Sequence, residues 1–196
     1  MNILVVQSHP YQKSFCAALA IRYTESALKL GHQVEFMQIA DMKFDPILRY
    51  GYRQETQSLE KDLINFQNKI TWADHIVWVY PNWWGGLPAL LKGLIDRSFL
   101  PGFAFKYTNG LLPIKLLTGK TSDIIMTLDT PIFFYKFFMG APGLKIMKSA
   151  ILGFCGIKVN NAFLCAPIRN STEEKREIWL KKASQLAKKL SVAGKP

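Results

Sequence analysis

Short apolar runs alternate with amphipathic segments along the whole chain. Residues 3–6 are apolar and rich in valine and isoleucine, and residues 14–30 then carry apolar side chains at helical spacing until Gly31. The unit recurs, with predicted strands at 3–6, 34–39, 75–80, 122–128 and 158–165 and predicted helices at 14–30, 58–73, 88–99, 142–153 and 172–190. Strands that alternate with helices pair in parallel through right-handed crossovers. The sequence therefore predicts an α/β fold, a three-layer α/β/α sandwich with a five-stranded parallel sheet.

Length and composition favour one domain. The chain has 196 residues, of which 49% are hydrophobic, and this is enough to bury a sizeable core. No internal repeat, low-complexity tract or proline- and serine-rich linker divides it. We expect a single domain over residues 1–196.

The three cysteines, Cys16, Cys155 and Cys165, are odd in number and far apart. They lack metal-ligand spacing, so we expect buried reduced thiols, with neither a disulfide framework nor a metal site. The chain opens on an apolar run too short for a signal peptide. The most apolar later region, residues 124–143, is interrupted by charged residues, prolines and glycines, which argues against a membrane span. We expect a cytoplasmic protein.

The formal net charge of +11 raises the question of polyanionic partners, either nucleic acid or an anionic membrane surface. Much of the excess lies in the predicted C-terminal helix, where lysines and arginines between 175 and 189 form one solvated face. No nucleic-acid motif accompanies them, so nucleic-acid binding is not expected. A basic surface would also attract a phosphorylated cofactor such as NADPH.

The turn between the third predicted strand and the following helix contains Trp83, Trp84, Gly85 and Gly86. Indole rings offer wide apolar faces with an N–H at the edge, and glycines let backbone amides approach a ligand closely. Pro88 stands where a helix can begin. We interpret the turn as a slot for a flat aromatic ligand; the alternative is that both tryptophans pack in the core around an ordinary turn.

The first loop, residues 7–15, precedes a predicted helix whose N-terminal amides could hold a phosphate. Ser14 is placed as the N-cap, and His9 could donate a hydrogen bond to a phosphate oxygen. The loop is neither a Walker loop nor a GxGxxG turn, so it supports neither a nucleotide triphosphatase nor a Rossmann dehydrogenase. The alternative is that Ser14 only caps the helix.

Two further segments belong to the same predicted edge of the sheet, where ligands of open α/β sheets bind. Residues 127–131 follow the fourth predicted strand, and residues 132–139 then carry four phenylalanines and a tyrosine. So crowded an aromatic stretch is typical of a ligand or partner surface, with core packing as the alternative. Residues 101–107 add further aromatic area.

These motifs resemble one family. His9 with Ser14, the block at residues 80–93, the segment 102–107 and the segment 151–156 are similar, in order and spacing, to NAD(P)H quinone oxidoreductases of flavodoxin-like fold. The resemblance covers nearly the whole chain. It implies a tightly bound flavin, a homodimer with active sites at the subunit interface, and two-electron reduction of quinones by NAD(P)H. It favours FAD, with FMN as the alternative.

The resemblance also assigns residues to the flavin. Those that would hold its phosphate are His9, Ser14, Phe15 and Cys16. Those that would line the isoalloxazine ring are Pro81, Asn82, Trp83, Trp84 and Gly85. Those that would meet the pyrimidine edge are Thr127, Leu128, Asp129 and Thr130.

Tyr135 matches a tyrosine that hydrogen-bonds the reduced flavin in mammalian members, so the resemblance makes it the catalytic candidate. The histidine that partners that tyrosine has no counterpart, because Ala141 stands in its register. Proton transfer then falls to Tyr135 alone, to backbone amides or to water. Phe105 and Tyr107 align with aromatic residues that cap the substrate.

In the mechanism we expect, NAD(P)H stacks over the flavin, passes hydride to it and leaves, and a quinone then occupies the same slot. One shared slot predicts ping-pong kinetics. Two other classes of protein remain open. One is an electron-carrier flavodoxin, although such carriers are usually small and acidic. The other is a flavin-binding accessory subunit of a potassium efflux system, a role that the basic surface would suit.

Overall fold

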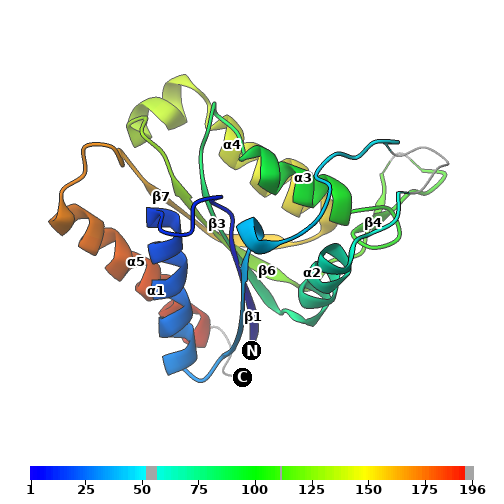
Figure 1. Cartoon of the computed structure of the whole chain (residues 1–196), viewed down its shortest axis with the longest axis horizontal. Helices are drawn as coiled ribbons and strands as arrows, with labels where there is room; N and C mark the ends of the chain where they lie inside the picture. Colours follow the sequence, from blue (N-terminus) through cyan, green and yellow to red (C-terminus); the bar gives the residue numbers. More distant parts are fainter. Residues whose placement is uncertain (52–56, 111, 193–196) are drawn as a thin grey trace.

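A computed structural model describes residues 1–51, 57–110 and 112–192, and its centre is a five-stranded sheet (Figure 1). The strands lie in the order β2-β1-β3-β6-β7, and every neighbouring pair is parallel. Their bounds are β1 Asn2–Gln7, β2 Gln33–Gln38, β3 His75–Pro81, β6 Thr121–Thr127 and β7 Lys158–Cys165. The predicted sheet is thus confirmed, with each strand within one or two residues of its expected range.

Helices cover both faces of the sheet (Figure 1). One face carries α1 (Phe15–Lys29) and α5 (Glu173–Val192), which pack against each other. The other face carries α2 (Lys61–Trp72), α3 (Ala89–Ser98), α4 (Pro142–Lys145) and the π-helix η3 (Ile146–Gly153). The three layers confirm the predicted sandwich. No helix in the described ranges is long and apolar enough to cross a bilayer.

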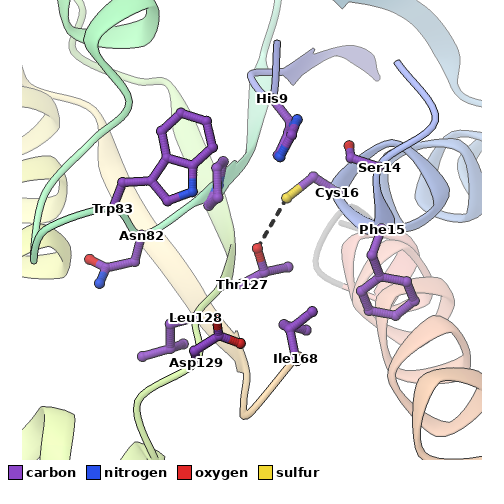
Figure 2. A pocket seen from close by; sticks show the side chains of 11 residues that line it. His9, Ser14, Phe15, Cys16, Asn82, Trp83, Thr127, Leu128, Asp129 and Ile168 are labelled. Atoms are coloured by element: carbon purple, nitrogen blue, oxygen red, sulfur yellow. Dashed lines mark hydrogen bonds between the residues drawn. The ribbon is translucent and has the colours of Figure 1, made fainter. Parts of the chain in front are cut away.

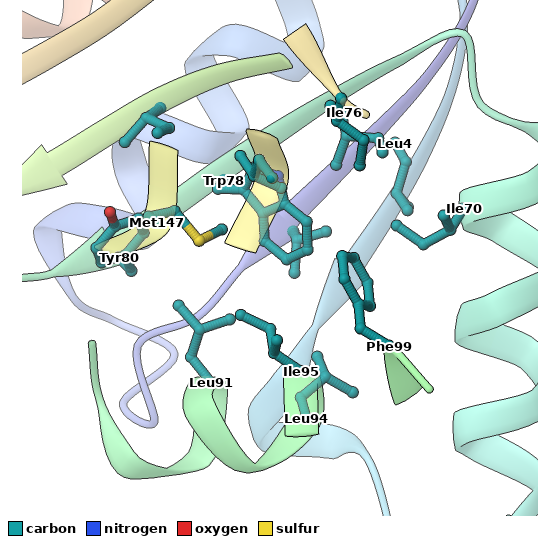
Figure 3. Close-up of a cluster of buried hydrophobic side chains, with 14 of the residues drawn as sticks. Leu4, Ile70, Ile76, Trp78, Tyr80, Leu91, Leu94, Ile95, Phe99 and Met147 are labelled. Carbon is teal, nitrogen blue, oxygen red and sulfur yellow. The ribbon is translucent and has the colours of Figure 1, made fainter. Parts of the chain in front are cut away.

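The sheet has one hydrophobic core on each face, because successive side chains along each strand point to opposite faces. Trp78 and its neighbours of even number point to the layer of α2 and α3, while Val77 and Val79 point to α1 and α5. Figure 3 shows Trp78 surrounded by Leu91 and Ile95 of α3 and by Phe99. Full burial of such a large apolar side chain contributes about 2–3 kcal/mol. These cores hold the strand ends in fixed register, which positions the loops beyond them.

Four short elements were not expected from the sequence. β4 (Phe105–Lys106) and β5 (Ile114–Lys115) form a small antiparallel pair, η1 (Ile39–Asp41) is one 3-10 turn, and η2 (Phe134–Phe138) is one π-helical turn. Elements of two to five residues are too short to produce a periodic pattern. The predicted helix at 142–153 is helical throughout but changes from α to π hydrogen bonding at Ile146.

The predicted helix at 58–73 begins only at Lys61. The preceding Glu60 has an extended backbone, and its carboxylate accepts hydrogen bonds from Arg97 Nη2 at 2.8 Å and from the backbone N–H of Asp45 at 3.0 Å. Because these tertiary contacts hold residue 60, helical propensity alone placed the start too early.

Candidate functional site

A cavity opens beyond the carboxyl ends of the strands, where β1 lies between β2 and β3 and the strand order reverses. Loops that follow β1, β3, β6 and β7 surround it (Figure 2). The residues that line it are His9, Ser14, Phe15, Cys16, Pro81, Asn82, Trp83, Thr127, Leu128, Asp129 and Ile168. Ten of these were predicted as cofactor-binding positions, and the fold brings all ten to one place.

His9 lines the cavity together with the first turn of α1, and no described residue bonds to its second ring nitrogen. The backbone N–H of Tyr11 donates to His9 Nδ1 at 2.9 Å, so Nδ1 must be an acceptor and the neutral ring carries its proton on Nε2. Partial burial lowers the pKa of His9, which favours the neutral ring at pH 7. The ring meets Trp83 edge-on, with 5.4 Å between ring centroids. Nε2–H is therefore a fixed neutral donor beside the indole.

The first turn of α1 adds backbone donors to the same end. Ser14 caps the helix, because its Oγ accepts from the N–H of Ala17 at 3.2 Å. The amides of Phe15 and Cys16 precede the first intrahelical hydrogen bond, as at every helix start, so they can bind a ligand. With the partial positive charge of the helix N-terminus, this arrangement suits a phosphate.

Cys16 lies under this end of the cavity and is turned toward the sheet. Its Sγ is 3.2 Å from Thr127 Oγ1, and its side chain is buried (Figure 2). Burial raises the pKa of the Cys16 thiol to about 12, so the sulfur stays neutral. The contact joins α1 to β6. Cys16 can thus offer a phosphate its backbone amide, while its side chain already has a partner.

The tryptophan turn separates its two indoles. Trp83 and Gly86 pair through N–H···O=C bonds of 3.1 and 2.9 Å, which leaves Trp84 and Gly85 at the tip with φ of +52° and +76°. Such left-handed values favour glycine, and a tryptophan there is strained. As a result the Trp83 ring faces the cavity, while Trp84 is fully exposed. Trp84 and Gly85, predicted to line the flavin ring, are not among the lining residues.

The segment of α4 supports this turn from below. A Cβ added to Gly143 would lie 2.7 Å from Asn82 Oδ1 and 2.7 Å from the carbonyl oxygen of Gly85, so only glycine fits there. Ala141, the residue before α4, has φ of +52° and is buried. The position where the resemblance expects a histidine is therefore a packed backbone turn.

Tyr135 lies behind the cavity. It is fully buried, and its hydroxyl donates to Asn82 Oδ1 at 3.4 Å and accepts from the backbone N–H of Leu144 at 3.1 Å. Burial raises the pKa of its phenol. Among the described residues, those that line the cavity do not include Tyr135. Its contact with the site runs through the amide of Asn82.

The far side of the cavity is closed by the loops after β6 and β7. Asp129 Oδ1 accepts from the backbone N–H of Arg169 at 2.7 Å, and the N–H of Ile168 donates to the carbonyl oxygen of Leu128 at 3.1 Å. Sequence reasoning missed Ile168. Its position just beyond a predicted parallel strand was the available signal, since that edge is where ligands bind. Thr130, a predicted contact, lies beyond this closure and is not among the lining residues.

Phe105 and Tyr107 line a different cavity of about 330 Å³, between α3 and η3. Their rings meet edge-on with 5.2 Å between centroids, and the Phe105 ring also meets that of Phe154 with 5.0 Å between centroids. In the described part of the chain, no residue lines both cavities. The fold therefore does not bring the predicted substrate aromatics next to Trp83 of the same chain.

Comparison with known proteins agrees with this fold. A family described as flavodoxin-like fold matches residues 1–190, and the chain belongs to that family. An uncharacterized NAD(P)H oxidoreductase of Haemophilus influenzae is 31% identical over 189 residues, which are 94% of this chain and 93% of that protein. A ribosyldihydronicotinamide dehydrogenase [quinone] of Mus musculus is 27% identical over 96% of this chain and 91% of its own length. The resemblance inferred from the motifs is confirmed.

Solved structures give the same answer for the fold. The protein Smu.1420 of Streptococcus mutans is 29% identical, with a TM-score of 0.82 over 96% of this chain and all of that one. An FMN-dependent NADH-azoreductase of Bacillus anthracis, solved with FMN, is 20% identical, with a TM-score of 0.74 over 97% of this chain and all of that one. The expected preference for FAD over FMN finds no support among these proteins.

Proposed function

We propose that the protein is a flavin-dependent NAD(P)H:quinone oxidoreductase. The observation that carries this proposal is a single cavity lined by His9, the first turn of α1 and the ring of Trp83, so that phosphate donors and an aromatic wall lie together. The related NAD(P)H oxidoreductase and quinone dehydrogenase support the substrate classes. We further propose one cytoplasmic flavin-binding domain over residues 1–196.

The residues present fit a flavin. His9 Nε2–H and the first amides of α1 suit its phosphate, Trp83 offers a flat apolar wall, and Thr127 lies between the strand ends in contact with Cys16 (Figure 2). The glycine at position 143 keeps the turn close enough to support that wall. When bound, a flavin would supply two-electron chemistry, accepting hydride from a reduced nicotinamide and passing it to a quinone.

The protein itself would supply position and electrostatics. The Trp83 wall would orient flat rings face to face, which sets the distance for hydride transfer. Donors among residues 127–130 would stabilise negative charge at the ring edge. Nicotinamide and quinone would use the same open side in turn, so we expect ping-pong kinetics. Tyr135 would act by fixing Asn82, since its hydroxyl holds the amide oxygen.

We propose FMN as the cofactor, with FAD as the alternative. The phosphate end is the same for both flavins, and the azoreductase that shares the fold was solved with FMN. Chromatography of the flavin released from purified protein decides between them. Recovery of FAD in stoichiometric amount would overturn the FMN assignment while leaving the flavin proposal intact.

We also propose a homodimer. Phe105 and Tyr107 line a cavity away from Trp83 in their own chain, so they can cap a substrate only at the site of a second subunit. Tyr107 is exposed and available for that contact. Sedimentation velocity gives the mass, and Tyr107→Ser should raise the KM for menadione with flavin content unchanged. A monomer with full activity would contradict the proposal.

The deciding experiment is NADPH or NADH oxidation by the flavin-loaded protein with menadione as acceptor. We expect steady turnover, and parallel lines in a double-reciprocal plot at several menadione concentrations. Retained flavin without turnover would favour an electron carrier or the accessory subunit of a potassium efflux system, and co-purification with a membrane transporter would single out the latter. Protein that binds neither FMN nor FAD would refute all three.

Tyr135→Phe tests the role of the tyrosine hydroxyl. We expect a loss of turnover beyond twofold, because Asn82 would lose its partner. A rate within about twofold of the wild type corresponds to less than roughly half a kcal/mol in the barrier, and would remove Tyr135 from the mechanism.

A further inference from the structure

Five large apolar side chains stand exposed on and beside one turn of helix. Phe133, Phe134, Phe137, Phe138 and Met139 have 43–74% of their surface exposed, and we call them the aromatic patch. Their segment, residues 132–139, was expected to be either a ligand or partner surface or part of the core. Tyr135 alone of its aromatic residues is buried. Exposed apolar patches of this kind mark interaction surfaces in soluble proteins.

The patch is one packed cluster of rings. The ring centroid of Phe133 lies 4.9 Å from that of Phe137 and 5.7 Å from that of Phe138. Phe134 stacks on Phe138 with 5.2 Å between ring centroids. The π-helical turn η2 places these side chains on neighbouring positions of its outer surface. Tyr135 fixes the turn from beneath through Asn82 and Leu144. The rings are therefore presented together on an anchored turn.

The charged residues within the patch and in the segment that follows it are positive. Between Asp129 and Glu173 the chain has no acidic residue. Lys136 lies within the patch, and Lys145 and Lys148 follow it; all three are exposed. Lys145 Nζ lies 3.6 Å from the position a Cβ would take at Gly140, so its ammonium group lies at the end of the aromatic turn.

We propose that the aromatic patch docks the protein on an anionic lipid surface. Phenylalanine rings insert at the boundary of headgroups and acyl chains, and neighbouring lysines are attracted by anionic headgroups. The absence of carboxylates from this stretch of chain is the charge complementarity that such a surface requires. The patch residues do not line the cavity of Phe105 and Tyr107.

Docking in this way would bring the cavity close to the membrane. Residues 141–143 join the patch to the tryptophan turn, with Gly143 packed against Asn82 and Gly85. If the proposed function holds, on which this step alone rests, a quinone dissolved in the bilayer would reach the site from the lipid side. Lipid binding needs neither flavin nor turnover, so it is measured separately from that function.

Co-sedimentation with vesicles tests the proposal. We compare pure phosphatidylcholine vesicles with vesicles of phosphatidylcholine and phosphatidylserine at about two to one. The wild type should pellet with the anionic vesicles, and Phe137→Ser with Phe138→Ser should weaken binding by about tenfold or more. Lys136→Gln with Lys148→Gln should weaken binding severalfold and reduce its salt dependence. The matched control is Ile21→Ser with Ile178→Ser, which removes two exposed apolar side chains on α1 and α5 and should bind as wild type.

A readout on the wild type keeps the test decisive if a variant fails to fold. Brominated phosphatidylcholine in the anionic vesicles should quench tryptophan fluorescence, because Trp84 is exposed on the turn that packs against Gly143, shortly after the patch in the chain. No pelleting with anionic vesicles, or equal loss in the control pair, would overturn the proposal. So would a wild-type dimer that becomes a monomer in the Phe137 and Phe138 variant without any lipid binding, since a second copy would then cover the patch.

Discussion

Each end of the sheet carries a histidine, and the two lie in opposite surroundings. His9 follows β1 at the C-terminal edge, is half-buried and keeps Nε2–H free. His75 begins β3 at the N-terminal edge, is fully buried, and has Nδ1 2.8 Å from Thr121 Oγ1. One end of the sheet thus retains donors for a ligand, and the other uses its polar groups to hold the fold. A count of polar residues alone would not tell the two ends apart.

We call the edge of the sheet near His75 the closed end and the edge near His9 the open end. The polar groups of the closed end gather around Asp123, whose carboxylate has no solvent exposure. Asn161 Nδ2 donates to Oδ1 at 2.7 Å, Tyr23 donates to Oδ2 at 3.4 Å, and His75 Nε2 lies 3.5 Å from Oδ2. Burial, and then the charge of Asp123, raises the pKa of the Tyr23 phenol. A buried carboxylate needs such partners, because desolvation otherwise costs several kcal/mol.

Asp123→Ala should lower the stability of the fold without changing the affinity for FMN at the open end. It leaves Asn161 and Tyr23 buried without their acceptor, so we expect a loss of about 3 kcal/mol in the free energy of unfolding. Urea unfolding measures the loss, and FMN titration of the folded fraction should give an unchanged Kd.

The control is Asp96→Ala, which removes an exposed ion pair with Lys92 and should cost less than about 1 kcal/mol. Equal losses in Asp123→Ala and Asp96→Ala would mean that the buried cluster contributes little to stability.

Gly143→Ala tests whether the close packing of α4 against the Trp83 turn is needed for cofactor binding at the open end. The new methyl group would meet Asn82 Oδ1 and the Gly85 carbonyl, both at 2.7 Å, and the backbone oxygen can move only with the turn. We expect the Kd for FMN to rise by about tenfold or more, roughly 1.4 kcal/mol, with a smaller change in stability. In the control, Gly110→Ala, the nearest atom is a threonine hydroxyl at 3.4 Å, and FMN affinity should not change. Unchanged affinity in Gly143→Ala would show that the turn tolerates displacement.

The difference between the two ends also explains what the sequence could predict. The alternation of strands and helices placed the open edge and its loops, because burial on both faces leaves a periodic signal. The individual cofactor positions came from the family resemblance, and ten of them line the cavity. Trp84 does not line the cavity, because the turn directs the two neighbouring indoles apart. That geometry depends on φ values, which no pattern of apolar residues encodes. The Asp123 cluster joins β3, β6, β7 and α1, and contacts between distant segments leave no local signal.

His9→Ala should weaken FMN binding at the phosphate end. Loss of one neutral hydrogen bond to a phosphate corresponds to about 1 kcal/mol, or a fivefold rise in Kd. Riboflavin, which lacks the phosphate, is the matched ligand, and its Kd should be the same for both proteins. Because burial lowers the pKa of His9, the ring is neutral at pH 7, and protonation at lower pH would add attraction to the phosphate. An equal loss for riboflavin would place His9 at the ring instead.

Cys16 lies at the open end, but its side chain is buried and already has a polar partner, as the groups of the closed end do. A pKa raised to about 12 leaves roughly one thiol in ten thousand ionised at pH 8, and only the thiolate reacts with iodoacetamide. Cys155, with its pKa raised to about 11, and Cys165, raised further by burial, should behave alike. Mass spectrometry should therefore find almost no labelling of the native protein at pH 8, and threefold labelling in urea. Rapid native labelling confined to Cys16 would mean that its contact with Thr127 opens and that the thiol is available to a ligand.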